Sequence, residues 1–225
     1  GPQPLGYARI SLLLTLLLGG CGEPQQPTYE FIRGATMGTY YRVQFEPSAS
    51  CRPSQFVLDQ QLLAFNQSLS TYIADSELSL LNQAPAQALR PISERLNVAL
   101  VAAFELWRDS SGAFDVTVGP LVNIWGFGPD QGLPWPPSEA AQVNAAASVG
   151  MQHIELLPNK QIRKRLAAAY IDLSAIAKGQ AVDEIAEIMS GMGCEHFLVD
   201  IGGEVRVTGR NSAGKLWRVG IEVPR

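Results

Sequence analysis

The sequence predicts an α+β protein in which a mainly antiparallel sheet carries packed helices. Residues 197–208 and 153–167 each contain two β-rich segments joined by a short turn, and a short turn makes the joined strands antiparallel neighbours. Residues 92–109 and 180–192 carry apolar side chains at helical spacing. Hairpins and helices in separate parts of the chain together indicate an α+β architecture.

Composition indicates a folded protein and argues against nucleic-acid binding. The 225 residues are 46% hydrophobic and 17% charged, which is enough for one large domain or two small ones. The net charge is -4, from 17 basic and 21 acidic residues, without a lysine or arginine run that would track a nucleic-acid backbone. His153 and His196 lie on apolar stretches, and the histidines and cysteines lack metal-ligand spacing, so zinc is not expected.

The first twenty residues resemble an export signal. Residues 10–18 form an almost unbroken apolar run, too short to span a bilayer but typical of a signal peptide. Leu18-Gly19-Gly20-Cys21 resembles a bacterial lipobox. We therefore expect a lipoprotein signal at 1–20, a tether at 21–28 after a lipidated Cys21, and a folded domain at 29–225. The alternative is a buried or disordered helix, and the initial Gly1 leads us to expect a missing start.

Two cysteines remain after Cys21. An exported protein can join Cys51 to Cys194, but their positions in the sequence say nothing about their distance in space. We expect both thiols to be free.

The first half should contain one strand and three helical segments. Tyr40 to Phe45 is rich in β-branched and aromatic residues and predicts a strand after a bend. Residues 54–68 show a rough helical face, and Asp75 is expected to cap a short helical turn. Residues 92–109 form the most convincing helix of this half, with Gly112 just beyond its end.

Three features of this half are candidate ligand contacts. Met37 beside Gly38 is either core filler or a soft contact for a flat aromatic ring. Tyr72 is either a half-buried aromatic residue or a stacking or phosphate contact. The loop Gly112 to Pro120 offers backbone groups and the carboxylate of Asp115 to a heteroaromatic ligand.

The middle and end of the chain should contain a long loop, one helix and further strands. Residues 125–137 indicate a long surface excursion rich in proline and aromatic residues, and Ser138 should cap a helix reaching about Ser148. Residues 197–201 predict a buried strand that returns after Gly202-Gly203. That glycine pair either lets a phosphate come close to the backbone or forms a plain hairpin turn. Residues 215–223 should add another strand.

Residues 170–179 predict a short strand, a turn of small residues, and a helix from about Gln180 to Met192. Lys178 and free N–H groups at the helix start favour an anion such as phosphate. Asp172, at the end of the strand, can accept hydrogen bonds or help hold a hydrated divalent cation. The alternative is an ordinary strand-to-helix junction with a solvated lysine.

Several stretches together resemble one family. In chain order they are Thr36-Met37-Gly38-Thr39, Ser70-Thr71-Tyr72 with Asp75-Ser76-Glu77-Leu78, Gly112 to Pro120 with Trp125-Gly126-Phe127-Gly128, and Ile171 to Gly179. They resemble the ApbE-type FAD:protein FMN transferases, and the resemblance runs from about Thr28 to Arg225. It implies a flavin transferase fold that is incomplete at its C-terminal end.

The resemblance also implies an activity. The protein would use FAD as substrate and, with Mg²⁺ as cofactor, transfer FMN to a threonine hydroxyl of an exported acceptor protein, releasing AMP. Family acceptors include subunits of the sodium-pumping NADH:quinone oxidoreductase and of Rnf-type complexes. A lipid anchor on the periplasmic side of a bacterial membrane fits this family. The alternatives are a periplasmic FAD pyrophosphatase, in which water replaces threonine, and a flavin-binding lipoprotein without turnover.

Site residues follow from the resemblance position by position. The expected flavin-nucleotide contacts are Met37, Tyr72, Ala113, Phe114, Asp115, Asp172 and Lys178. The backbone carbonyl of Ala175 falls where the family binds its metal, and the sequence does not identify a catalytic base. The family continues well beyond a strand like Gly220 to Pro224 and carries a second metal cluster there. We therefore expect a truncated chain whose residues 22–225 bind Mg²⁺ and FAD weakly, if at all.

Overall fold

The computed structural model describes residue 1 and residues 28–129 and 132–221. The predicted signal, lipobox and Cys21 lie outside the described residues. None of the helices in the described ranges is long and apolar enough to cross a membrane.

Two antiparallel sheets confirm the predicted α+β class. The larger sheet has the order β1-β2-β6-β7, formed by β1 (Glu30–Thr36), β2 (Thr39–Phe45), β6 (Phe197–Ile201) and β7 (Glu204–Thr208). The smaller has the order β3-β5-β4, formed by β3 (Arg90–Pro91), β5 (Gln161–Lys164) and β4 (Ile154–Leu157). Both predicted hairpins are present, and Gly202-Gly203 forms the turn between β6 and β7.

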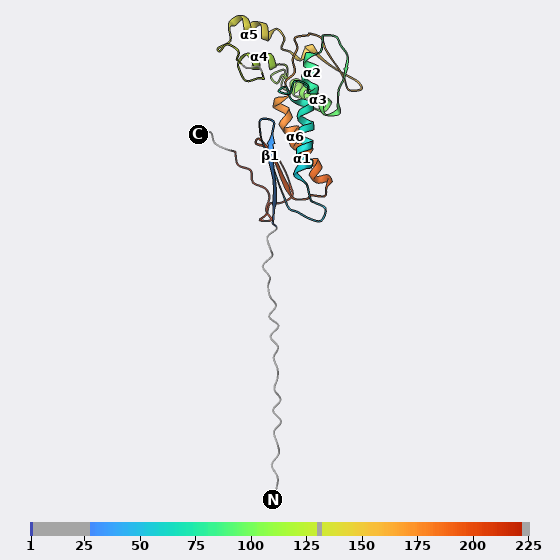
Figure 1. The fold of residues 1–225 in the computed structure, drawn as a ribbon, viewed down its shortest axis with the longest axis vertical. Helices are drawn as coiled ribbons and strands as arrows, with labels where there is room; N and C mark the ends of the chain where they lie inside the picture. Colours follow the sequence, from blue (N-terminus) through green and yellow to red (C-terminus); the bar gives the residue numbers. More distant parts are fainter. Residues whose placement is uncertain (2–27, 130–131, 222–225) are drawn as a thin grey trace.

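The helices are α1 (Gln55–Leu69), α2 (Glu77–Gln83), α3 (Glu94–Asp109), α4 (Gly119–Ile124), α5 (Glu139–Ala146) and α6 (Ser174–Gly191), with a 3-10 turn at Met151–His153. Figure 1 shows α1 and α6 running side by side from the larger sheet towards the other helices. Helix α6 packs on β6 and β7, while α1 packs on β1. These two long helices therefore join the sheet to the helical end of the molecule.

Four helices begin directly after a serine that caps them. In each, the serine Oγ accepts a hydrogen bond from the backbone N–H three residues later, at 3.0 to 3.3 Å; the serines are Ser54, Ser76, Ser93 and Ser138. Such a cap stabilises a helix by about 1 kcal/mol. The predicted cap at Asp75 is wrong by one residue, because Ser76 provides it.

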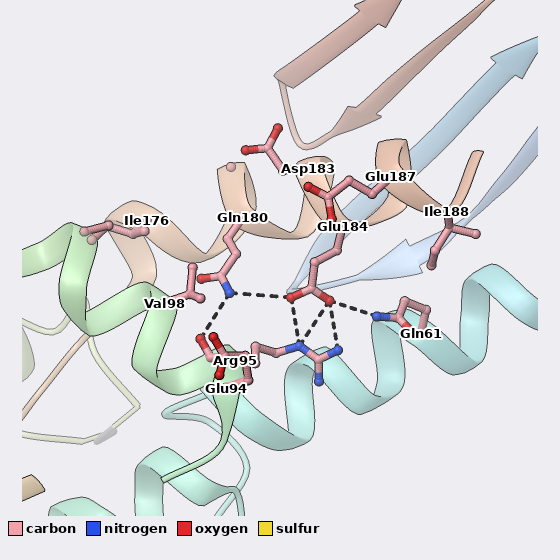
Figure 2. A pocket seen from close by; sticks show the side chains of 12 residues that line it. Gln61, Glu94, Arg95, Val98, Ile176, Gln180, Asp183, Glu184, Glu187 and Ile188 are labelled. Atoms are coloured by element: carbon pink, nitrogen blue, oxygen red, sulfur yellow. Dashed lines mark hydrogen bonds and ion pairs between the residues drawn. The ribbon is translucent and has the colours of Figure 1, made fainter. Parts of the chain in front are cut away.

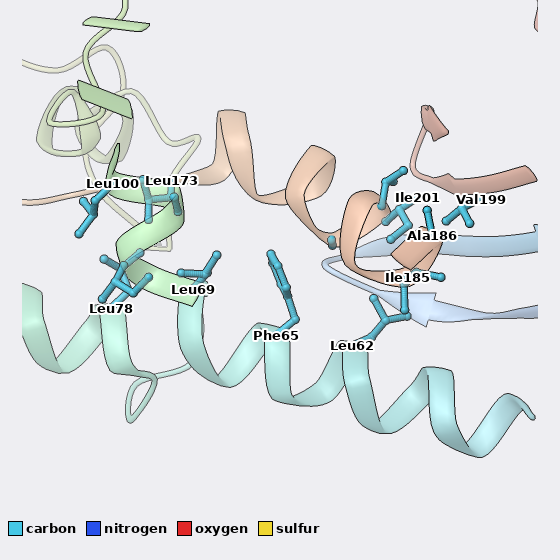
Figure 3. Close-up of a cluster of buried hydrophobic side chains, with 14 of the residues drawn as sticks. Leu62, Phe65, Leu69, Leu78, Leu100, Leu173, Ile185, Ala186, Val199 and Ile201 are labelled. Carbon is cyan, nitrogen blue, oxygen red and sulfur yellow. The ribbon is translucent and has the colours of Figure 1, made fainter. Parts of the chain in front are cut away.

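One core runs along α1 and α6. Figure 3 shows Leu62, Phe65 and Leu69 of α1 on one side of this cluster, with Ile185 of α6 and Ile201 of β6 towards the sheet. Because every third or fourth residue of α1 faces this cluster, the helix is amphipathic as predicted.

Tyr41 ties the sheet to α1. Its side chain is almost fully buried, and its hydroxyl donates a hydrogen bond of 2.5 Å to Oδ1 of Asp59. Burial, together with this hydrogen bond, raises the pKa of Tyr41 well above its usual range. The hydroxyl is therefore a permanent donor at any ordinary pH.

Three predictions about element boundaries are wrong. Helix α6 begins at Ser174 and not near Gln180. Residues 170–172 have no regular secondary structure and belong to neither sheet of the described chain, and residues 215–221 form no strand. A strand needs a neighbouring strand to pair with, and neither segment pairs with one among the described residues.

The expectation of free thiols is also wrong, because Cys51 and Cys194 form a disulfide. Their Cα atoms are 4.7 Å apart although 143 residues separate them in sequence. Cys51 lies between β2 and α1, and Cys194 lies between α6 and β6. The bond therefore links the connection before α1 to the connection after α6. Sequence spacing could not reveal this proximity, because it depends on how α1 and α6 pack.

We expect replacement of both cysteines by serine to lower the free energy of unfolding by about 3 kcal/mol, because the bond closes a long loop in the unfolded chain. Urea unfolding followed by circular dichroism measures the loss. Dithiothreitol should shift the wild-type midpoint and leave that of the double-serine variant unchanged. A wild-type midpoint insensitive to reductant would contradict the prediction.

Candidate functional site

A cavity of about 640 Å³ lies where three of the motif stretches meet. Its lining comes from the β1–β2 turn, the C-terminal end of α1 with the residues after it, and the start of α6: Met37, Gly38, Phe65, Asn66, Leu69, Ser70, Thr71, Tyr72, Ile73, Ser174, Ala177 and Lys178. This volume is in the range of small-molecule sites. The fold thus brings together Met37, Tyr72 and Lys178, three of the predicted contacts.

The first wall of the cavity is the tight turn between β1 and β2. Met37 has a φ of 50° and Gly38 a φ of 69°, as in a two-residue hairpin turn. Glycine adopts this conformation freely, whereas methionine does so at a cost of about 1 kcal/mol. Nδ2 of Asn66 donates to Oγ1 of Thr36 at 3.1 Å and so fastens the turn to α1. Met37 is partly buried against the core, which holds its side chain at the cavity edge.

Tyr72 forms the second wall. It is 65% exposed, and its hydroxyl donates to the carbonyl of Phe127 at 3.4 Å. The chain just before Tyr72 is held in place, because the carbonyl of Ser70 accepts hydrogen bonds from the hydroxyls of Ser76 and Ser79. An exposed aromatic ring on a fixed loop is suited to stacking against a flat ligand.

Lys178 forms the third wall, but not from the turn that the sequence predicted. It lies in the second turn of α6, and its Nζ is 3.0 Å from Oε2 of Glu204 at the start of β7. Both side chains are partly exposed. The lysine is therefore not simply solvated, and an anion in the cavity would compete with Glu204 for its charge.

Asp172 lies just before α6 and already serves its first turn. Oδ1 of Asp172 accepts hydrogen bonds from the backbone N–H of Ser174 at 2.9 Å and from its hydroxyl at 2.5 Å. The N–H of Ile176 and that of Ala177 both reach the carbonyl of Leu173. Few N–H groups therefore remain at this helix start for a phosphate, and the predicted helix-end anion site is weaker than the sequence suggested.

The segment before α6 is held by a residue that sequence reasoning missed. Asn82, near the end of α2, donates from Nδ2 to the carbonyl of Ile171 at 2.9 Å, and its Oδ1 accepts from the N–H of Ile171 at 2.8 Å. The N–H of Asp172 donates to the carbonyl of Val116 at 2.8 Å. These bonds replace a neighbouring strand. A single asparagine in an amphipathic helix gives no sequence signal for this role.

The loop after α3 lies against the same segment but contributes no lining to the cavity. Oδ1 of Asp115 accepts from the N–H and hydroxyl of Thr117, and Oδ2 accepts from the N–H of Met151. Phe114 packs on the core and Ala113 is exposed. Asp115 thus holds its own loop together, and the structure does not bring Ala113, Phe114 or Asp115 into contact with the cavity lining.

Ala175 lies exposed in the first turn of α6. Among the described residues, no group of three or more histidine, cysteine, aspartate or glutamate side chains could hold a metal ion. The oxygen donors near this turn are the carbonyl of Ala175 and the carboxylate of Asp172. They suit Mg²⁺, which commonly uses one or two protein ligands together with water and phosphate oxygens.

A larger groove of about 940 Å³ lies between α1, α3 and α6 but holds none of the predicted nucleotide contacts. Figure 2 shows its polar side chains bound to one another. Nη2 of Arg95 and Nε2 of Gln61 both donate to Oε2 of Glu184 at 2.8 Å, and Nε2 of Gln180 donates to the carbonyl of Arg95. The polar side chains of this groove therefore serve to connect the three helices to one another. The smaller cavity is the better candidate for a ligand site.

The family model described as the ApbE family matches residues 37–225, and the chain therefore belongs to that family. The FAD:protein FMN transferase of Vibrio cholerae serotype O1 is 37% identical over 218 residues, which cover 96% of this chain and 64% of the relative. That of Salmonella typhimurium is 36% identical over 229 residues, with the same coverage.

Solved structures agree. The flavin transferase ApbE from Vibrio cholerae superposes with a TM-score of 0.84 at 36% identity, covering 88% of this chain and 64% of that one. The apo form of the Pseudomonas stutzeri flavinyl transferase ApbE gives a TM-score of 0.79 at 35% identity, covering 88% and 63%. The chain thus spans about 64% of the length of these relatives.

We expect Gly119→Ala to destabilise the protein by about 2 kcal/mol, because overpacking a filled site costs this much. An added Cβ would lie 2.4 Å from Cδ1 of Tyr170 and 3.4 Å from Cβ of Asp172. The matched control is Gly179→Ala in α6, where a Cβ meets no atom within 4 Å. It should stabilise the helix by about 0.5–1 kcal/mol. Urea unfolding measures both, and equal effects of the two variants would contradict the packing argument.

Proposed function

We propose that the protein transfers FMN from FAD to a threonine hydroxyl of an acceptor protein, with Mg²⁺ as cofactor and AMP as the second product. The observation that carries the proposal is the convergence of Met37, Tyr72 and Lys178 on one cavity, with Asp172 just before the helix that lines it. The relatives named FAD:protein FMN transferase support the same activity.

The chain's own residues would mainly position the substrate. Met37 and Tyr72 offer a thioether and an aromatic ring to the flat flavin, and Lys178 offers a positive charge to the pyrophosphate. The threonine hydroxyl gives up its proton to solvent and its oxygen forms a bond to the phosphorus of the FMN half. The bond between that phosphorus and the bridging oxygen breaks, and AMP leaves with the bridging oxygen. Mg²⁺, held through Asp172 and the Ala175 carbonyl, would neutralise charge on the phosphates.

The same proposal places the protein on the periplasmic side of a bacterial membrane, anchored through a lipid on Cys21. The disulfide between Cys51 and Cys194 supports an exported protein, because such bonds persist in oxidising compartments. The acceptors would then be exported subunits of electron-transport complexes of the sodium-pumping NADH:quinone oxidoreductase or Rnf type. Lipid labelling of the wild-type protein and of Cys21→Ser tests the anchor.

We expect Asp172→Asn to lower the rate of FMN transfer by about 100-fold, because the charge beside the phosphates and metal is lost. Asparagine keeps the Oδ1 acceptor for Ser174, so the start of α6 should remain intact. The assay measures covalent flavin fluorescence on the acceptor and AMP release by the full-length protein.

The same assay separates the alternatives. AMP release that needs no acceptor would identify a pyrophosphatase, and the absence of both products would identify a flavin-binding protein without turnover. Full transfer activity in Asp172→Asn would remove Asp172 from the site.

We expect Lys178→Met to raise the dissociation constant for FAD about tenfold, which corresponds to the loss of one charge-assisted contact. The control is Glu204→Gln, which removes the charge of the lysine's partner while leaving the lysine in place. It should not weaken FAD binding, since Lys178 then faces the ligand without competition. Flavin fluorescence quenching measures both constants. Equal weakening in the two variants would mean that the ion pair, and not the lysine, matters.

A further inference from the structure

Lys164, the last residue of β5, is buried with only 1% of its surface exposed. Its ammonium group donates three hydrogen bonds, all to backbone carbonyls: to Asn82 at 2.5 Å, to Ala167 at 2.9 Å and to Ala169 at 3.1 Å. All three of its N–H donors are therefore used.

This charge is costly to bury. Within the described residues Lys164 forms no ion pair, whereas its neighbours Arg163 and Arg165 both reach Glu155. Burial lowers the pKa of Lys164 from its usual value. An apolar side chain would fill the same space without this desolvation. A leucine or methionine in the same place could not donate these three hydrogen bonds, so the role of Lys164 lies in the carbonyl groups that it binds.

The three carbonyls belong to two separate parts of the chain. Asn82 lies at the C-terminal end of α2, where carbonyls lack helical partners and a positive charge is favourable. Ala167 lies in the turn after β5 and Ala169 directly after that turn, in the stretch of chain that leads to Asp172 and α6. The ammonium group thus joins the end of α2 to this segment.

Asn82 also binds the segment before α6 through its side chain. While its backbone carbonyl accepts from Lys164, its side-chain amide exchanges two hydrogen bonds with the backbone of Ile171. Asp172 follows directly. Lys164 therefore fixes both the segment before Ile171 and the residue that grips Ile171.

We propose that Lys164 is a positioning residue for the flavin site, whose three carbonyl bonds hold residues 167–171 against α2 and so fix the place of Asp172 at the start of α6. The role in flavin binding rests on the proposed function, while the holding of the segment does not. Lys164 lies outside the cavity lining.

The experiment compares Lys164→Met with Ile162→Val in the full-length protein. Ile162 lies two residues earlier on β5, equally buried, but makes no bond to residues 167–171. Hydrogen exchange of the peptide spanning 167–174 is measured against that of β6, and FAD affinity is measured by flavin fluorescence quenching.

In Lys164→Met we expect the amides of Ile171 and Asp172 to exchange at least about tenfold faster, with β6 unchanged, and the FAD dissociation constant to rise about tenfold. The Michaelis constant for the acceptor protein should stay the same. Ile162→Val should leave the FAD constant within about twofold. If Lys164→Met does not fold, Lys164→Gln, which keeps two N–H donors, should show the same changes at smaller size.

Unchanged exchange at Ile171 and Asp172, or a loss of FAD affinity no greater than in Ile162→Val, would overturn the proposal. Should the wild-type protein bind no FAD, the proposed function fails. The exchange measurement then decides by itself whether Lys164 holds the segment.

Discussion

The site depends on how the segment before α6, which pairs with no strand of the described chain, satisfies its backbone N–H and C=O groups. Residues 169–173 run through the interior between α2, the loop after α3 and the start of α6. Their N–H and C=O groups cannot stay unpaired there without a penalty of one or more kcal/mol each. The side chain of Asn82, the ammonium group of Lys164 and the carbonyl of Val116 take the place of neighbouring strands. Polar side chains therefore determine where Asp172 lies, and sheet register does not.

The elements that local chemistry dictates could be predicted from the sequence. The cap of α5 at Ser138 and the hairpins β4–β5 and β6–β7 depend on residues close together in the chain. The sequence pattern places the start of α6 too late, because Lys178-Gly179 is typical of a turn. Gly179 lies instead inside the helix, where the hydrogen bonds from Ser174 to Asp172 stabilise the first turn despite the weak helix propensity of glycine.

Prediction of the site was limited in a different way. Met37, Tyr72 and Lys178, three of the residues that the resemblance names as nucleotide contacts, line one cavity. The part played by Glu204 beside Lys178 and by Asn82 beside Ile171 depends on contacts between residues 26 and 89 positions apart. No local pattern predicts which distant residue such a side chain will contact. The disulfide was missed for the same reason.

The separation of 143 residues between Cys51 and Cys194 also orders events during synthesis. When Cys51 leaves the ribosome, its partner has not yet been made, and it has to wait until nearly all of the described chain is translated. Domains begin to compact while they emerge. Cys51 therefore has no partner thiol until nearly all of the described chain has been made, and the bond can close only when both of the segments that it joins are present.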